Sequence, residues 1–398
     1  MINLNLSICG DLNLDTSVLH KLLEEFQSTS LALTHVDVYP IPWEAYRQEL
    51  TSMIIHNHKG DVSQAGAPVA SDMMAMNALR SFTPHEVDEM GGESAFAPVA
   101  WQSVHQISEK QVWSIPWMAD PRVFIYWRDM FEKAVADEQA AFQTPENFIE
   151  ALKRVRASGI PRPWGINTRH KHSAIHTVAS WVWACGGNFI SEDGKRAIFL
   201  EPEALAGLMA YFGAIPFMAN ESQMTDYQAT NQAFANRQSA VILGNGETVA
   251  SILKGIPVET RSKLGVALPF GVPLVGGSNL VVWAGTSHEH AAVNLVRFLV
   301  EKAAQSAYPK NLDYLPVRSE VLSEPPYTTD PILKGLADAL YQGRTFPITK
   351  LSGLLEEHLG NALVSIWASL FSDPNANLEA LISSTLIPVV RRYDNWMT

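Results

Sequence analysis

The spacing of apolar side chains predicts the first elements of the chain. Residues 2–9 carry an apolar side chain at every second position, which is the period of a half-buried strand. Residues 16–27 repeat apolar side chains at helical spacing, and residues 31–39 return to a β-rich run before Pro40. The chain therefore opens in the order β-α-β, which is the unit of a parallel α/β sheet.

Similar signals predict elements along the remaining sequence. Thr144, Pro145 and Glu146 supply a capping residue, a first-turn proline and an acidic first turn for a helix that ends near Ala157. The other expected helices cover residues 43–57, 128–136, 173–185, 201–217 and 288–301, with more after residue 317. The expected strands cover residues 239–243, 264–268 and 280–284, with a short strand and loop at 61–68, an irregular segment at 93–101 and a connection at 276–279.

A polar step interrupts two β-rich runs near the first third of the chain. Residues 111–115 and 122–127 flank this step, which holds Trp117, Asp120 and Arg122. A strand that faced a core would bury the carboxylate at a high cost unless it were paired. We therefore interpret the step as a crossover at the surface between two folded bodies. The alternative is a β-turn inside one large sheet, capped by Asp120.

Composition narrows the classes of partner. The chain has 398 residues, of which 47% are hydrophobic and 18% charged, so at ~150 residues per domain we expect two or three globular bodies. The formal net charge is -12, and Lys and Arg do not cluster. A nucleic acid or an anionic membrane needs a concentrated basic face, so we expect neither as a partner. A small neutral ligand fits better.

The sequence carries little information on compartment. Cys9 and Cys185 are the only cysteines, too few for a disulfide scaffold and too far apart to indicate a metal pair. No run reaches the ~18 apolar residues of a membrane span. The first residues lead straight into the predicted strand without an export segment. We expect either a cytoplasmic protein or one whose export signal lies outside this sequence.

Catalytic and metal-binding signatures are scarce. Residues 244–246 read Gly-Asn-Gly, but the third glycine and the acidic residue of a dinucleotide fingerprint are missing. His170, His172 and His176 have a spacing that could converge on a metal, yet basic neighbours would repel a cation, so a solvated loop is the better interpretation. We predict no catalytic residue, no metal and no cofactor.

Tryptophan is abundant in positions that are not simply apolar. The chain has eleven, and several lie beside glycines, prolines or polar residues: Trp43, Trp113, Trp117, Trp164, Trp181 and Trp183. An indole ring matches the apolar face of a sugar, while carboxylates and amides bond its hydroxyls. A single tryptophan is more often a core residue, but the group favours one or two that line a cleft for a polyol.

Short segments in a characteristic order suggest a family. They are residues 10–11, 38–43, 115–122, 126–131, 144–148, 185–187, 232–241, 276–278 and 314–318. Their order and spacing, over nearly the whole chain, resemble the extracellular solute-binding proteins of bacterial ABC importers. The likeness is to family 1, the sugar-binding group that includes maltose-binding protein. No single segment is diagnostic.

The resemblance implies an α/β fold of the periplasmic-binding-protein type. Two lobes of discontinuous chain are joined by a hinge, with the ligand cleft between them. The implied crossovers lie near residues 117–121, 265–269 and 314–317. The implied lobes are residues 1–118 with 268–314, and residues 119–267 with 315–398.

The resemblance also implies a function. We expect a non-enzymatic, monomeric substrate-binding protein that captures a mono- or oligosaccharide and delivers it to the transmembrane subunits of an ABC permease. Such a protein is periplasmic or extracellular, with or without a lipid anchor. Two alternatives stay open, namely a ligand-sensing protein without a transport role and a carbohydrate-processing enzyme. The enzyme would need two carboxylates about 5–10 Å apart, and nothing marks Asp11, Asp120 or Glu247 as the acid.

The chain departs from the family pattern in three places. Glu247 stands where many members have an aromatic platform, the Asp-rich stretch is reduced to residues 60–62, and Ala67-Pro68 replaces a polar-aromatic pair. The binding function therefore transfers better than the identity of the sugar. The predicted ligand contacts are Asp11, Trp43, Pro68, Trp117, Asp120, Arg122, Trp183, Glu247, Gly277 and Ser278.

Overall fold

The structure is a computed structural model in which two units can be described. It describes residues 2–10, 14–29, 33–56, 58, 60–107, 110–135, 137–218 and 224–397. Unit 1 comprises residues 1–120, 276–327 and 345–353, and unit 2 comprises residues 121–275, 328–344 and 354–398. Each unit is thus built from discontinuous chain.

These boundaries differ from those expected from the sequence. The boundary between Asp120 and Pro121 lies inside the expected crossover at residues 117–121. The segment 265–269 instead lies within unit 2, and 314–317 lies within unit 1. Residues 268–275 therefore belong to unit 2, while residues 315–327 and 345–353 belong to unit 1.

Unit 1 is built on one mixed sheet. The strand order is β11-β5-β10-β3-β1-β2, with β4 paired to β10. Strand β1 runs parallel to β2 and β3, whereas β10 runs antiparallel to β3. The strands are β1 (Ile2–Cys9), β2 (Thr34–Ile41), β3 (Val62–Ala65), β4 (Leu79–Arg80), β5 (Ile115–Pro121), β10 (Val275–Trp283) and β11 (Leu315–Pro316). The helices are α1 (Ser17–Thr29), α2 (Trp43–Ile55), α3 (Ala67–Ala75), α4 (Pro84–Glu89), α5 (Pro98–Gln102), α12 (Glu289–Leu299), α13 (Lys302–Asn311) and α14 (Ser319–Leu322), with a 3₁₀ turn at Glu93–Ala95.

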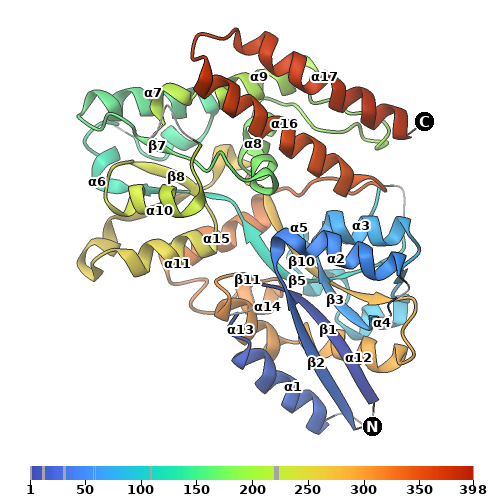
Figure 1. Cartoon of the computed structure of the whole chain (residues 1–398). Coiled ribbons are helices and arrows are strands. Elements are labelled where there is room, and N and C mark those ends of the chain that lie inside the picture. Colours follow the sequence, from blue (N-terminus) through green and yellow to red (C-terminus); the bar gives the residue numbers. More distant parts are fainter. Residues whose placement is uncertain are drawn as a thin grey trace. The chain divides into compact units, whose positions relative to one another are not determined.

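Helices cover both faces of this sheet, and β1 is accordingly buried on both faces. Leu4, Leu6 and Ile8 have no exposed surface and share one face, while Cys9 is buried on the other. The face that holds Cys9 packs against residues of α2 and α3, including Tyr46. Helices α1, α12 and α13 contact one another, and α12 contacts β1. Figure 1 shows β1, β2 and β3 side by side in blue.

Unit 2 contains a smaller sheet and most of the long helices. Its strand order is β7-β8-β6-β9, with β7 parallel to β8 and the other pairs antiparallel. The strands are β6 (Val123–Trp127), β7 (Trp164–Gly165), β8 (Val241–Gly244) and β9 (Leu264–Ala267). The helices are α6 (Arg128–Phe131), α7 (Pro145–Ala157), α8 (Lys171–Ala184), α9 (Pro202–Phe212), α10 (Tyr227–Ala235), α11 (Gly246–Gly255), α15 (Pro331–Gln342), α16 (Ser352–Ser372) and α17 (Leu378–Met397), with 3₁₀ turns at Ala140–Phe142, Ile215–Phe217, Val258–Lys263 and Pro269–Gly271. Among the described residues, no helix combines the length and apolarity that a bilayer crossing requires.

Several of these elements were predicted correctly from short stretches of the sequence. The predicted cap of α7 is confirmed, since Thr144 Oγ1 accepts a hydrogen bond from the Asn147 amide at 3.2 Å and Pro145 is the first helical residue. Helix α8 ends as expected before Gly186, which has a φ of 83°. The strand Ile2–Cys9 is also confirmed.

Four local expectations were wrong. The polar step at 115–121 is itself strand β5, and the expected loop after β3 holds helix α3. The expected helix at 128–136 is a single short turn, α6. Residues 276–279 lie inside β10 instead of between strands. In each strand case, pairing with neighbouring strands overrides the turn preference of glycine, proline and aspartate.

The core of unit 2 is a cluster of aromatic rings. Phe148 has no exposed surface and stacks on Phe124 with ring centroids 4.6 Å apart. The rings of Trp164 and Trp181 contact it edge-on at 5.2 and 5.7 Å. Such pairs add ~0.5–1.5 kcal/mol each beyond the area that they bury.

We predict that Phe148→Ala lowers the free energy of unfolding by about 3–5 kcal/mol, because it removes a fully buried ring and leaves a cavity. Urea denaturation followed by circular dichroism measures the change. The control is Val258→Ala, at a residue that is 70% exposed, which should change the value by less than about 0.5 kcal/mol. A loss for Phe148→Ala as small as that of the control would contradict the role of this cluster.

Candidate functional site

The carboxyl ends of three parallel strands meet at one edge of unit 1. Strand β1 leads to Gly10, β2 leads to Trp43 at the start of α2, and β3 leads to Gly66 before α3. Strand β10 runs the opposite way with Asn279 opposite Ala65, so its first residues lie at the same edge. We call Gly10, Trp43, residues 66–68 and residues 277–278 the unit 1 rim. Such edges are where α/β proteins bind small ligands.

Trp43 and Pro68 lie at the rim as the sequence suggested. Trp43 is 46% exposed, and its ring centroid lies 6.2 Å from that of Tyr46. Pro68 is half-buried near the start of α3. Neither α2 nor α3 has a capping side chain among the described residues, although the Ala45 amide of α2 bonds the Pro42 carbonyl at 3.0 Å. Asp11 follows Gly10 in the sequence but lies outside the described residues.

Gly277 and Ser278 belong to the rim through their backbone. Gly277 has a φ of 138°, and a Cβ there would overlap the carbonyl oxygen of Met118 in β5, so glycine is required. The Ser278 side chain is 3% exposed, and its hydroxyl accepts a hydrogen bond from Gln64 Nε2 at 2.8 Å. This burial argues against the predicted ligand contact by the Ser278 side chain, because its hydroxyl is already bonded inside the unit.

The prediction that Trp117 is a platform for a ligand is wrong. Its ring has no exposed surface and stacks on Tyr308 with centroids 5.0 Å apart. Strand β5 pairs with β11, where Pro316 lies opposite Met118, so the indole points into the core of unit 1. Asp120 lies at the end of the same strand and is half-buried.

Arg122 is held inside unit 2. It is 8% exposed, and its amide donates to the Leu274 carbonyl at 2.8 Å. Its Nη2 lies 3.1 Å from His176 Nδ1. A guanidinium only donates, so this contact uses Nδ1 of His176 as the acceptor. Glu356 Oε1 lies 3.9 Å from His176 Nε2 on the other side of the ring.

Trp183 is covered by an arginine that the sequence argument missed. The indole is 5% exposed, and the Arg344 guanidinium lies 4.8 Å from its ring centroid, a cation–π contact. Arg344 is half-buried. Burial alone lowers the pKa of its guanidinium, and no carboxylate in the described part of the chain adds a compensating contribution. Trp183 itself offers little surface to a ligand. No sequence signal marked this isolated arginine.

Glu247 lies in the first turn of α11 and is exposed. The helix is capped by Asn245, whose Oδ1 accepts from the Thr248 amide at 3.0 Å and from its hydroxyl at 2.8 Å. A carboxylate in a first helical turn is favoured by the helix dipole. That structural role explains Glu247 without a ligand, so its contact with a ligand stays a prediction.

The histidines and cysteines have ordinary surroundings. His170 stacks on Tyr227 with centroids 5.7 Å apart, and the described residues hold no group of three His, Cys, Asp or Glu suited to a metal ion. The side chain of His172 lies outside the described part. Burial raises the pKa of the Cys9 thiol well above its usual range, and a hydrogen bond with Tyr46 opposes this only in part. Cys9 is therefore a neutral core residue beside the rim.

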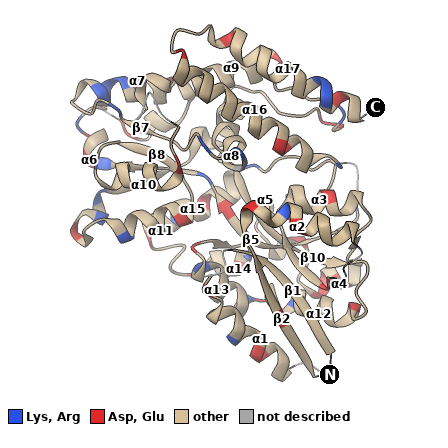
Figure 2. Cartoon of the chain, in the orientation of Figure 1, with Lys and Arg blue, Asp and Glu red and all other residues tan. Residues whose placement is uncertain are grey.

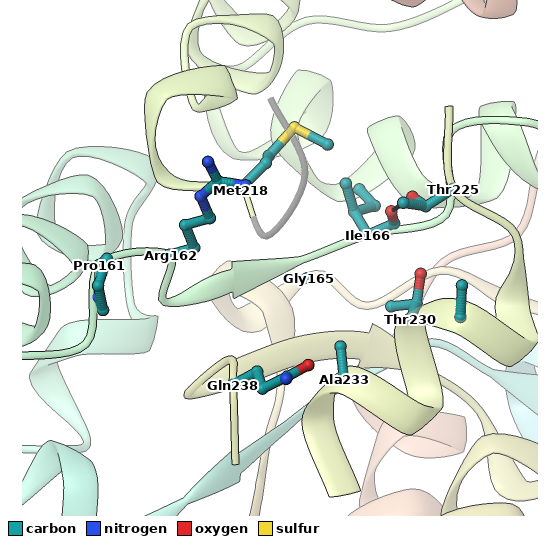
Figure 3. Close-up of a pocket in the computed structure, with 10 residues that line it drawn as sticks. Pro161, Arg162, Gly165, Ile166, Met218, Thr225, Thr230, Ala233 and Gln238 are labelled. Carbon is teal, nitrogen blue, oxygen red and sulfur yellow. Dashed lines mark hydrogen bonds between the residues drawn. The ribbon is translucent and has the colours of Figure 1, made fainter. Parts of the chain in front are cut away.

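A cavity in unit 2 lies away from the predicted residues. It has a volume of about 480 Å³ beside β7 and α10. Figure 3 shows Gly165 and Ile166 on one side, with Thr230, Ala233 and Gln238 opposite. None of the predicted site residues lines it. The structure thus gathers Trp43, Pro68 and Gly277 in unit 1, and separately pairs Arg122 with His176 and Trp183 with Arg344 in unit 2.

Comparison with protein families gives a match over most of the chain. A family model described as "Bacterial extracellular solute-binding protein" matches residues 21–335. The maltotriose-binding protein of Pyrococcus abyssi is 24% identical over 347 residues, which are 82% of this chain and 67% of that protein.

Solved structures share the fold. The sugar-binding protein MalE from Xanthomonas citri has a TM-score of 0.83 at 16% identity, with 99% of this chain and 97% of that chain covered. An ABC transporter solute-binding protein from Thermotoga lettingae, bound with alpha-D-tagatose, has a TM-score of 0.79 at 17% identity, with 100% of both chains covered. The predicted periplasmic-binding-protein-like α/β fold is confirmed by these likenesses.

The two tryptophans that we expected to behave alike should separate on mutation. We predict that Trp117→Ala lowers the free energy of unfolding by about 3–5 kcal/mol, because it empties a fully buried, stacked site. Trp43→Ala should change it by less than about 1 kcal/mol, because its ring is already half in water. Chemical denaturation of both variants measures the difference. Equal losses would mean that Trp43 is a core residue and is not available to a ligand.

Proposed function

Since this chain belongs to the family of bacterial extracellular solute-binding proteins, we propose that it is the substrate-binding protein of an ABC importer and captures a mono- or oligosaccharide. The maltotriose-binding relative makes maltotriose the first candidate. The observation that carries the proposal is the unit 1 rim, where an exposed indole and uncapped helix amides lie at the ends of parallel strands.

The chemistry of the candidate residues suits a neutral polyol. The exposed face of Trp43 provides an apolar surface for the C–H face of a sugar ring. Asp120 accepts hydrogen bonds from hydroxyl groups, and backbone amides at the rim donate them. Figure 2 shows Lys and Arg interspersed with Asp and Glu along the described elements, and the formal net charge of -12 does not favour a polyanionic ligand.

Transport is the role that follows from such a receptor. The protein acts outside the cytoplasmic membrane and passes the bound sugar, chemically unchanged, to the transmembrane subunits of a permease. It works as a monomer that binds one ligand in a cleft. Turnover of an oligosaccharide by the purified protein would contradict this proposal in favour of a carbohydrate-processing enzyme.

We predict that maltose or maltotriose raises the melting temperature. A ligand that binds only the folded state at about 100 times its Kd stabilises that state by about 2.7 kcal/mol. A thermal-shift screen with these sugars and tagatose measures the effect, with amino acids and oligopeptides as the comparison. A shift with peptides alone would reject the sugar assignment while keeping the receptor function.

Asp120→Ala should separate a ligand contact from a structural role. A hydrogen bond to a charged group is worth about 1.5–3 kcal/mol, so we predict that the sugar binds at least about tenfold more weakly. The melting temperature without ligand should change little, because a partly solvated carboxylate contributes little to folding. Calorimetric titration and thermal melting measure the two effects.

The matched control is Asp37→Ala. The Asp37 side chain is 47% exposed and pairs with His35, and this residue lies within β2, away from the end of the strand. It should leave the affinity unchanged. If Asp120→Ala lowers the melting temperature sharply and leaves the affinity intact, Asp120 is a structural residue of β5.

A further inference from the structure

Strands β1 and β3 stop pairing before they reach the rim. The last residue pair between these two strands is Ser7 opposite Ser63. Strand β1 stays paired with β2 as far as Cys9 opposite Ile41. The backbone groups at the end of β1 therefore need another partner on the β3 side, because a buried amide without one costs free energy.

The side chain of Gln64 supplies that partner. It is 1% exposed, and its Oε1 accepts a hydrogen bond from the Cys9 amide at 2.9 Å. Its Nε2 donates to Ser278 Oγ at 2.8 Å. Its backbone lies opposite Leu280 in β10, and its carbonyl accepts from the Tyr46 hydroxyl of α2. One buried amide thus connects β1, β3 and β10 at the level where each meets the rim.

We propose that Gln64 is a positioning residue for ligand binding, which braces the end of β1 and the start of β10 in the geometry that the ligand requires. The idea rests on the proposed function, because it assigns a role at the same rim. Gln64 does not touch the ligand. Its bonds to the Cys9 amide and to Ser278 Oγ hold the residues next to Gly10 and Gly277 from inside the unit.

The bonding pattern explains why an amide is needed. The Cys9 amide requires an acceptor, and Gln64 offers one while its Nε2 group donates to Ser278 on the opposite side. An apolar side chain of equal length fills the space but leaves both the Cys9 amide and the Ser278 hydroxyl without this partner. We expect the two strand ends to shift toward other partners, which changes the rim.

Gln64→Met is the test variant, because it keeps length and removes both bonds. We predict that it weakens binding of maltotriose at least about tenfold in calorimetric titration. The matched control is Gln305→Met. Gln305 has no exposed surface and bonds in a similar way in the same unit. Its Nε2 donates to the Trp117 carbonyl at 2.8 Å, and its Oε1 accepts from the Val317 amide at 2.9 Å. It should lower the melting temperature by a similar amount and change the affinity less than about twofold.

Gln64→Glu provides a rescue that a purely structural role does not predict. A neutral carboxyl group keeps the acceptor and the donor, and burial raises the pKa of an introduced carboxyl. The affinity of this variant should be near that of the original protein at about pH 5 and fall toward about pH 8 as the group ionises. The original protein should show no such change.

A readout without ligand separates this proposal from the sugar assignment. In Gln64→Met, hydrogen exchange of the peptide containing Cys9 and Gly10 should be faster, while exchange in α7 of unit 2 stays unchanged. Faster exchange together with no sugar binding by the original protein would support the brace and reject the proposed ligand. Unchanged exchange, or an unchanged affinity for a sugar that the original protein binds, would overturn the brace. If Gln64→Met does not fold, Ser278→Ala removes one of the two bonds and should show the same effects at smaller size.

Discussion

A buried polar group must find its partner inside the protein, and in unit 1 this constraint shapes the edge where ligands are expected. Ser63, Gln64 and Ser278 are almost completely buried in a sheet that is covered on both faces. Each is bonded: Ser63 Oγ accepts from Trp283 Nε1 at 2.9 Å, and the other two bond each other. Gln64 Oε1 also accepts from the Cys9 amide, so the end of β1 is bonded from inside the unit while the ring of Trp43 stays exposed.

The sequence could predict features that depend on neighbouring residues, and it could not predict those that depend on residues far away in the chain. A helix start such as Thr144-Pro145 is settled by residues within one turn, so it was predicted correctly. Strand β5 was mistaken for a surface step because Pro116 and Asp120 are poor strand residues. Its pairing with β11 involves residues almost two hundred positions later, and no local pattern contains that information.

The exposure of the candidate site residues also depends on residues far away in the chain. Trp43 and Trp117 both follow a proline, yet one ring is 46% exposed and the other has no exposed surface. Their difference comes from Tyr308 of α13, which stacks on Trp117, so only the tertiary structure distinguishes them. Arg344 was missed for the converse reason. Its partial burial and its contact with Trp183 distinguish it, and a single arginine in a sequence shows neither.

Asp120 lies where the chain passes from unit 1 to unit 2. Strand β5 leaves unit 1 at Asp120, and β10 enters it at Gly276. On the unit 1 side, Gly277 packs so closely on Met118 that no side chain fits between them. On the unit 2 side, the amide of Arg122 donates to the carbonyl of Leu274. The outgoing and returning segments are therefore in contact on each side of the boundary. Asp120 therefore lies in one of two connecting segments that contact each other at these two points.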